Sequence, residues 1–268
     1  MESPTRCCMD ASDTVPIQSL RTAKDIVDFL VENDGAGVTE TAERIDRPLS
    51  TTHEYLNTLT EIGYLIRGDD GYYVSSLHLS VGTEVRSQDP LYAAAKPEID
   101  KFAAETDNNI VLLKEESGYG VTLYSVENDD SMRIQPRAGN RNYLHINAGG
   151  KAILASLPHE RVEAIVENVG LDAVTENTIT DRETLFEELE TIREVGYAVS
   201  REEDIVGIHE IAIPILVEDA RNIGSILVYG PASEFTDERL TEELPEALRR
   251  LKNVLEFNLT YAQYSTTQ

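Results

Sequence analysis

The sequence predicts an α+β chain with an N-terminal winged helix-turn-helix, a linker helix and a C-terminal α/β domain. Three patterns support this prediction. Short amphipathic helices precede a β-prone hairpin in the first third of the chain, a helical pattern with a proline inside it follows, and strands then alternate with amphipathic helices. At 268 residues, the chain is long enough for two domains with separate hydrophobic cores.

A first helix is expected over residues 19–31, where apolar side chains recur at three- and four-residue spacing. Its inward face comprises Leu20, Ala23, Ile26, Val27 and Leu30. A second helix opens at residues 38–39 and places Ala42 and Ile45 inward. It ends before Pro48, because proline breaks a helix.

The stretch over residues 48–74 predicts a third helix followed by a hairpin. We expect Ser50 to be the N-cap and Gly63 to end the helix in a left-handed cap. The buried stripe consists of Thr52, Leu56, Leu59 and Ile62. Residues 64–66 and 72–74 are short β-prone runs on either side of a turn. Helix, tight turn, helix and hairpin form a winged helix-turn-helix, in which the second helix of the pair enters a DNA major groove.

With that stripe buried, polar side chains on the rest of the third helix point outward. Hydroxyl, imidazole and amide groups donate to, or accept from, base edges and phosphates. The candidate DNA-reading residues on this helix are Ser50, Thr51, His53 and Asn57. The candidates for phosphate contact are Arg44, Arg47 and the wing residue Arg67. The alternative is that all of these are ordinary solvated residues of a small helical domain.

A linker helix is expected over residues 84–106, interrupted by Pro97, with an apolar side that could pair with a second copy. Beyond it, strands are expected over residues 109–114, 119–126, 196–200, 208–217 and 222–229. Helices are expected over residues 147–157, 158–169, 181–194 and 237–260. Strands with helices on their faces predict an α/β sandwich around one sheet.

The chain is strongly acidic, with 49 acidic residues, 23 basic residues and a formal net charge of −26. This charge would repel DNA in dilute buffer. An acidic surface on a well-patterned chain indicates a halophilic archaeon, whose cytoplasmic salt at about 1 M would screen charges beyond about 3 Å. In such salt, DNA reading depends on hydrogen bonds and apolar contacts more than on counterion release. The alternative is an acidic surface that docks a basic partner.

Residues 1–14 are expected to form a disordered tail. This tail contains Cys7 and Cys8, the two cysteines of the chain, and their adjacency disfavours a structural disulfide. No signal peptide is recognisable, and no run approaches about 18 apolar residues. We therefore expect a cytoplasmic protein that has no membrane partner.

Patterns that would indicate catalysis, a cofactor or a metal do not emerge. Nucleophile, paired acid–base and nucleotide-binding fingerprints are absent. Lys151 follows two glycines without the Walker spacing, so we expect a structural or edge residue. His145 and His209 are far apart in sequence and have no Cys or His cluster nearby. We therefore expect no enzyme, no cofactor and no metal ion.

Four stretches carry a resemblance to a known family: LSTTHEYLNTLTEIGYL, LHINAGGKAILASL, LFEELETIREVGYAVSREEDIVGIHEIAIPI and ILVYGP. From about residue 19 to residue 260, the chain resembles the IclR family of transcriptional regulators. The resemblance implies a winged helix domain over residues 15–83, the linker helix over 84–106 and a GAF-like effector-binding domain over 107–268. It also implies a small-molecule effector and a homodimer or dimer of dimers on a palindromic operator in double-stranded DNA.

One residue departs from the family pattern in the DNA-binding domain. The family often has arginine where this chain has Glu54, and a carboxylate repels phosphate. We therefore expect phosphate contact to shift to Arg47 and Arg67. Glu54 is expected to be a solvated surface residue, although it could accept from a cytosine amino group.

The resemblance also implies positions that contact the effector. They fall on Ala148, Gly149, Ser200, Glu210, Leu227 and Tyr229. An unpaired carboxylate disfavours a carboxylate ligand. Glu210 therefore predicts a neutral, polyhydroxylated or aromatic effector rather than a small dianion. In the alternative, Glu210 pairs with Arg201 or Arg137 and the pocket accepts anions.

Taken together, these features predict a sequence-specific DNA-binding regulator of transcription whose DNA binding is modulated by a small metabolite in the C-terminal domain. One alternative is a metabolite-binding protein or an enzyme that uses the winged helix only for oligomerisation. Another alternative is an architectural DNA-binding protein that has no ligand.

Overall fold

The structure, a computed structural model, describes residues 16–128, 134, 136–216 and 223–266. The expected tail over residues 1–14 lies outside the described residues. The chain divides into two compact units between Val85 and Arg86. Each unit has a hydrophobic core of its own.

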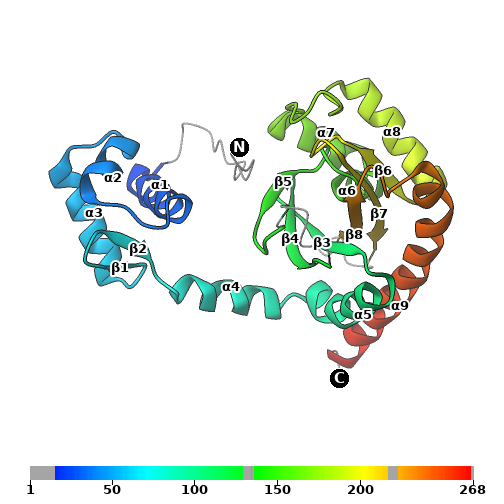
Figure 1. The fold of residues 1–268 in the computed structure, drawn as a ribbon, viewed down its shortest axis with the longest axis horizontal. Coiled ribbons are helices and arrows are strands. Elements are labelled where there is room, and N and C mark those ends of the chain that lie inside the picture. Colours follow the sequence, from blue (N-terminus) through cyan, green and yellow to red (C-terminus); the bar gives the residue numbers. More distant parts are fainter. Residues whose placement is uncertain (1–15, 129–133, 135, 217–222, 267–268) are drawn as a thin grey trace. The chain divides into compact units, whose positions relative to one another are not determined.

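The N-terminal unit packs three helices against a short hairpin (Figure 1). The elements are α1 (Gln18–Glu32), α2 (Val38–Ile45), α3 (Leu49–Glu61), β1 (Leu65–Arg67) and β2 (Tyr72–Val74). The two strands pair antiparallel. The core comprises Ile26, Leu30, Ala36, Leu56, Leu59, Leu65 and Tyr72. The order of helix, turn, helix and hairpin confirms the predicted winged helix-turn-helix.

Three details of the predicted helices are wrong. Ser50 is not the N-cap of α3, because Pro48 occupies that position and Ser50 lies in the first helical turn. The side chains of Leu20 and Ile62 are not buried but are 65% and 56% exposed. Both residues lie near the end of a helix, beyond the part that the rest of the unit covers.

The single linker helix expected over residues 84–106 is also wrong. Two helices, α4 (Leu77–Ser87) and α5 (Pro90–Thr106), occupy this segment. They are separate because the Asp89 side chain caps α5, accepting hydrogen bonds from two backbone N–H groups of its first turn. Pro90 then fills the first helical position. Pro97 lies inside α5 without ending it. The apolar side that was expected to pair with a second copy is instead buried in the core of the C-terminal unit, through Leu91, Ala95, Ile99 and Ala103.

The C-terminal unit is built on one six-stranded antiparallel sheet with the strand order β5-β4-β3-β8-β7-β6. In chain order, the strands are β3 (Asn109–Glu116), β4 (Tyr119–Val126), β5 (Arg141–Tyr143), β6 (Ala198–Arg201), β7 (Ile208–Ile215) and β8 (Gly224–Pro231). Sequence patterns missed β5, because three residues are too few to show a period. The expected strand ends at residues 217 and 222 lie outside the described residues.

Helices cover both faces of this sheet (Figure 1). One face packs against α6 (Ala148–Ser156), α7 (His159–Val169) and α8 (Arg182–Val195). The other face packs against α5 and α9 (Leu244–Thr266), which a short π-helix (Arg239–Glu243) precedes. These layers confirm the predicted α/β sandwich around one sheet. Among the described residues, no helix is both long enough and apolar enough to cross a membrane.

Candidate functional site

The outer side of α3 carries the side chains that were predicted to read DNA bases. Ser50 and His53 are exposed, whereas Thr51 and Asn57 are half-buried. His53 Nδ1 and Asn57 Nδ2 lie 3.1 Å apart, and the Tyr72 hydroxyl donates to Asn57 Oδ1 at 3.4 Å. Asn57 therefore connects α3 to the hairpin, a contact that the sequence did not indicate.

The three arginines predicted to contact phosphate are all exposed. Arg44 lies in the last turn of α2, Arg47 in the turn before α3, and Arg67 at the end of β1. Arg47 lines a cavity of about 510 Å³ between α2 and α3. Glu54 is exposed on α3. To a polyanion, the unit thus offers guanidinium donors from Arg44, Arg47 and Arg67, whereas the Glu54 carboxylate on α3 repels it.

In the C-terminal unit, three of the residues predicted to contact an effector stand side by side across three strands. Ser200 on β6 pairs with Glu210 on β7, and Glu210 pairs with Tyr229 on β8. Residues paired in register share one face of a sheet. All three side chains are buried, on the face that α6 covers. Leu227 lies one row further along, opposite Ala212.

The first turn of α6 contacts this row. Asn147 caps α6 by accepting the backbone N–H of Gly150 at 2.8 Å. The backbone N–H of Ala148 donates to Glu210 Oε2 at 2.9 Å. This bond places the carboxyl group of Glu210 at the N-terminus of α6, where unpaired backbone N–H groups favour an anion.

Gly149 brings the backbone of α6 against the sheet. Ser225 on β8 donates its hydroxyl to the Gly149 carbonyl at 2.9 Å. A Cβ atom at Gly149 would lie 2.2 Å from Leu113 Cδ1 and 3.3 Å from Leu227 Cδ1. Any larger residue at this position would therefore require the Leu113 side chain to move. All six predicted effector positions thus lie where α6 meets β6, β7 and β8.

A buried lysine, expected only as a structural or edge residue, lies beside this row. Lys151 is 1% exposed, and its Nζ donates to Glu203 Oε1 at 2.7 Å and to the Val199 carbonyl at 2.9 Å. Glu188 Oε1 on α8 lies 3.3 Å from the same nitrogen. These contacts use the three donors of the ammonium group.

Burial shifts the acids of this site toward their neutral forms. Desolvation, followed by repulsion from Asp204, raises the pKa of Glu210 to about 8. Desolvation also raises the pKa of Asp204 to about 6, against a hydrogen bond from Asn147 that lowers it. The pKa of Glu203 is likewise raised by desolvation and lowered by Lys151. At neutral pH, Glu210 therefore carries its proton for most of the time.

Sequence reasoning missed the contribution of Asn147, Glu203 and Asp204 to this site. The available signal was Lys151 inside the apolar stretch AGGKAILAS, because a buried lysine requires a charged partner. The partner is Glu203, in the loop between β6 and β7. Nothing in the sequence pattern assigned that loop to α6.

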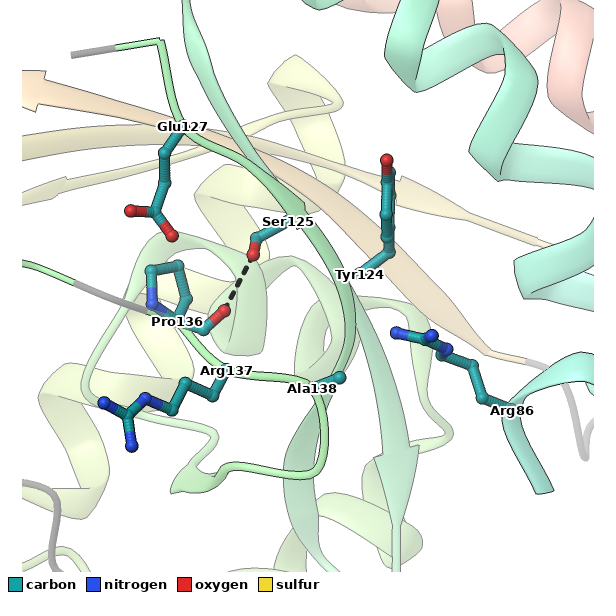
Figure 2. A pocket seen from close by; sticks show the side chains of 7 residues that line it. All are labelled: Arg86, Tyr124, Ser125, Glu127, Pro136, Arg137 and Ala138. Carbon is teal, nitrogen blue, oxygen red and sulfur yellow. Dashed lines mark hydrogen bonds between the residues drawn. The ribbon is translucent and has the colours of Figure 1, made fainter. Parts of the chain in front are cut away.

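The alternative in which Glu210 pairs with Arg201 is wrong. Arg201 instead donates to Asp237 Oδ1 at 2.6 Å. Arg137 lines a separate cavity of about 360 Å³. Figure 2 shows this cavity, in which the Ser125 hydroxyl donates to the Pro136 carbonyl at 2.8 Å.

The two histidines considered as metal ligands each contact a backbone carbonyl. His145 Nε2 lies 3.0 Å from the Asp172 carbonyl, and His209 Nδ1 lies 2.9 Å from the Phe235 carbonyl. Burial lowers the pKa of His145. In the part of the chain that the structure describes, no group of three or more His, Cys, Asp or Glu could hold a metal ion.

Comparisons with known proteins match both units. The family model "IclR helix-turn-helix domain" matches residues 19–68, and "Bacterial transcriptional regulator IclR C-terminal" matches residues 83–254. The probable HTH-type transcriptional regulator ArcR of Halobacterium salinarum is 30% identical and aligns over 92% of this chain and 95% of its own.

Solved structures agree with this match. The crystal structure of IclR from Thermotoga maritima is 30% identical, with a TM-score of 0.75 over 90% of this chain and 98% of its own. A double mutant of the PobR inducer binding domain from Acinetobacter, in complex with 3-hydroxybenzoic acid, is 25% identical. Its TM-score is 0.56 over 60% of this chain and 95% of its own.

Proposed function

Because the chain belongs to the IclR family of transcriptional regulators, we propose that it binds operator DNA through α3 and that a small molecule bound beneath α6 changes this binding. The helix-turn-helix DNA-binding domain and the C-terminal ligand-binding domain are common to the family. The mechanism is a population shift, in which the effector binds one conformation of the C-terminal domain more tightly than another.

The observation that carries the proposal is the buried row of Ser200, Glu210 and Tyr229. Ser200 Oγ is buried and has no hydrogen-bond partner among the described residues. An unsatisfied buried hydroxyl costs about 1–3 kcal/mol, which a ligand that bonds to it would offset. A ligand-binding role is supported by the relative from Acinetobacter, whose inducer binding domain holds 3-hydroxybenzoic acid.

The side chains of this buried row indicate the chemical class of the effector. Glu210 lies at the centre of the row beside Asp204, whose pKa of about 6 leaves it mostly charged at neutral pH, and this charge disfavours a small dianion. Leu227 and Tyr229 offer apolar and aromatic surface, and Ser200 offers a hydroxyl. We therefore propose an effector with an aromatic or hydroxylated body.

DNA reading is proposed for Ser50, Thr51, His53 and Asn57, and phosphate contact for Arg44, Arg47 and Arg67. A palindromic operator would be read by a homodimer or a dimer of dimers. Support for self-association comes from α4, where Leu79, Val81 and Val85 are exposed and no residue is buried.

The remaining proposals concern the cellular environment of the protein and the boundaries of its domains. We propose a cytoplasmic protein of a halophile, consistent with the net charge of −26 and with the relative from Halobacterium salinarum. The proposed boundaries are residues 15–83 for the winged helix domain, 84–106 for the linker and 107–268 for the effector domain.

The test is binding to the upstream region of the protein's own gene in potassium chloride at about 1 M, where counterion release is weak. The Thr51→Ala, Asn57→Ala variant should bind specific DNA about tenfold or more weakly, because it loses base-edge contacts. Two control variants distinguish the loss of DNA contacts from a disturbed fold of the winged helix domain. Glu61→Ala changes an exposed residue at the end of α3, and Tyr72→Phe removes only the hydroxyl that contacts Asn57.

Specific binding that only the double variant loses would support α3 as the reader. The absence of specific binding by the wild-type protein at any salt concentration would overturn the proposal. It would favour the alternative in which the winged helix serves only oligomerisation.

A further inference from the structure

Three acidic side chains gather around the first turn of α6. Asn147, at the cap of the helix, donates to Asp204, and the backbone N–H of Ala148 donates to Glu210. One turn later, Lys151 donates to Glu203. Asp204 and Glu203 both act electrostatically on Glu210, so the three carboxyl groups lie near one another at the start of α6.

The donors of the described residues leave two oxygen atoms of this region without a hydrogen-bond partner. Lys151 has already committed its ammonium group to Glu203, Glu188 and a backbone carbonyl. Glu203 Oε2 is buried and has no hydrogen-bond partner among the described residues, and the same holds for Ser200 Oγ. Ser200 is 1% exposed, and the side chain of Glu203 is 11% exposed. A ligand that supplies donors would satisfy both, whereas a ligand of acceptors alone could accept from Ser200 Oγ but would leave Glu203 Oε2 unpaired.

The place that would suit an anion is occupied by the protein itself. The N–H groups at the start of a helix favour a negative charge. At α6, Glu210 accepts the Ala148 N–H, and Asn147 accepts the Gly150 N–H. A ligand carboxylate would have to displace Glu210 and lie close to Glu203 and Asp204, which repel it.

We propose that the effector carries an organic ammonium or guanidinium group and that this group binds between Glu203, Asp204 and Glu210. The inference rests on the proposed function, because it names the chemical class of effector for the same site, and it replaces the neutral charge that the sequence predicted for the effector. A polyatomic cation fits better than a metal ion, because no metal-sized cluster of ligands is present among the described residues. The expected preference differs from that of the relative whose inducer binding domain holds a carboxylic acid.

Binding of such a cation releases a proton. Without ligand, burial holds a proton on Glu210, whose pKa is about 8. A cation beside Glu210 favours the carboxylate, so the proton leaves for the solvent. The other groups facing Glu210 are Asp204 and Glu203 from the β6–β7 loop, Lys151 from α6 and Tyr229 from β8. The affinity for a cation should therefore rise with pH below about 8, by up to about tenfold per pH unit.

The experiment uses the full chain in about 1 M potassium chloride, to screen nonspecific attraction to its acidic surface. The probes are two series with matched bodies. The first comprises n-butylamine, n-butylguanidine, n-butanol and butyrate, and the second comprises benzylamine, benzamidine, benzyl alcohol and benzoate. Thermal shift reports binding, and calorimetry in two buffers that differ in ionisation enthalpy counts the protons exchanged.

Cationic probes should raise the Tm and release up to one proton, whereas matched alcohols and carboxylates should bind at least about tenfold more weakly. Glu210→Gln and Asp204→Asn should each weaken cation binding. Asp237→Asn is the matched control, because its exposed carboxylate pairs with Arg201 away from the site.

The inference is overturned if alcohols or carboxylates bind as tightly as the cations, if cation binding survives both site variants, or if no cationic probe changes the Tm. These outcomes leave the proposed function standing as long as the chain binds its operator and another ligand modulates that binding. A chain that binds no operator fails the proposed function, whatever the probes show.

Discussion

The carboxyl group of Glu210, in the middle of the sheet, accepts a hydrogen bond from the backbone N–H of Ala148 at 2.9 Å. Two effects oppose each other at this contact. The helix terminus favours the charged carboxylate, whereas burial favours the neutral acid and is the larger effect, since the pKa rises to about 8. The contact between α6 and β7 is therefore sensitive to pH and to any charge that enters the site.

The Glu210→Gln variant should become more stable relative to the wild-type protein as pH rises. Glu210 has an ordinary pKa of 4.5 and a folded-state pKa of about 8. Between these values, the unfolded chain loses the proton while the folded chain keeps it. Rising pH therefore lowers the free energy of unfolding of the wild type by up to about 1.4 kcal/mol per pH unit. Glutamine removes this dependence and still accepts the Ala148 N–H.

Urea titrations of the full chain at several pH values between about 5 and 8 measure this difference. Asp237→Asn serves as the control. Arg201 lowers the pKa of Asp237, so this group changes the pH dependence of stability only at more acidic pH, below the range measured. A stability difference between Glu210→Gln and wild type that does not change across this range would contradict the prediction.

The Lys151→Met variant should lose about 3–5 kcal/mol of stability, because removing one partner leaves a buried charge uncompensated. The charge belongs to Glu203, whose carboxylate lies 2.7 Å from Lys151 Nζ. Adding Glu203→Gln to this variant should restore part of the loss. Lys96→Met is the matched control and should change stability little, since the Lys96–Asp100 pair is exposed. Stability is measured by urea unfolding. If Lys151→Met and Lys96→Met lose equal stability, burial of the Lys151–Glu203 pair is not the cause of the loss.

Much of the fold could be predicted from the sequence, because amphipathic periodicity is a local property. The leucines that recur along the expected helix over residues 237–260, from Leu240 to Leu259, are all buried. The errors arise where the local spacing of apolar residues does not determine burial or the ends of helices. Ile62 fits the apolar stripe of α3 but lies at the end of the helix, where little covers it. The break between α4 and α5 depends on the Asp89 cap, which an uninterrupted helical pattern concealed.

The candidate effector site was predictable only in part. Side chains alternate along a strand, so Leu227 and Tyr229 must share a face, and both lie on the face that α6 covers. Strand register, which sets Glu210 between Ser200 and Tyr229, depends on contacts between distant segments. The partner of Lys151 lies 52 residues away in the chain, so no local pattern could reveal it.

Two glycine substitutions should have opposite effects on stability. A Cβ at Gly150 would lie 2.1 Å from the Leu144 carbonyl oxygen, so Gly150→Ala should cost about 1–3 kcal/mol or more. A Cβ at Gly82, within α4, would meet nothing within 4 Å. Gly82→Ala should therefore gain about 0.5–1 kcal/mol, because alanine is the better helix former. Thermal unfolding of the two variants checks both signs, and stabilisation by Gly150→Ala would refute the close approach of α6 to Leu144.

The Glu54→Gln variant should bind operator DNA more tightly at low salt and no differently at high salt. Glu54 is exposed on the outer side of α3, where a carboxylate repels phosphate. At about 1 M salt, charges are screened within about 3 Å, so the repulsion disappears. Binding is measured by fluorescence anisotropy from about 0.2 M to about 2 M potassium chloride, and the gain should shrink as counterion effects weaken. Glu61→Gln, at the end of the same helix, is the control. If Glu54→Gln instead weakens specific binding at every salt concentration, Glu54 accepts a hydrogen bond from a base and is not a surface charge.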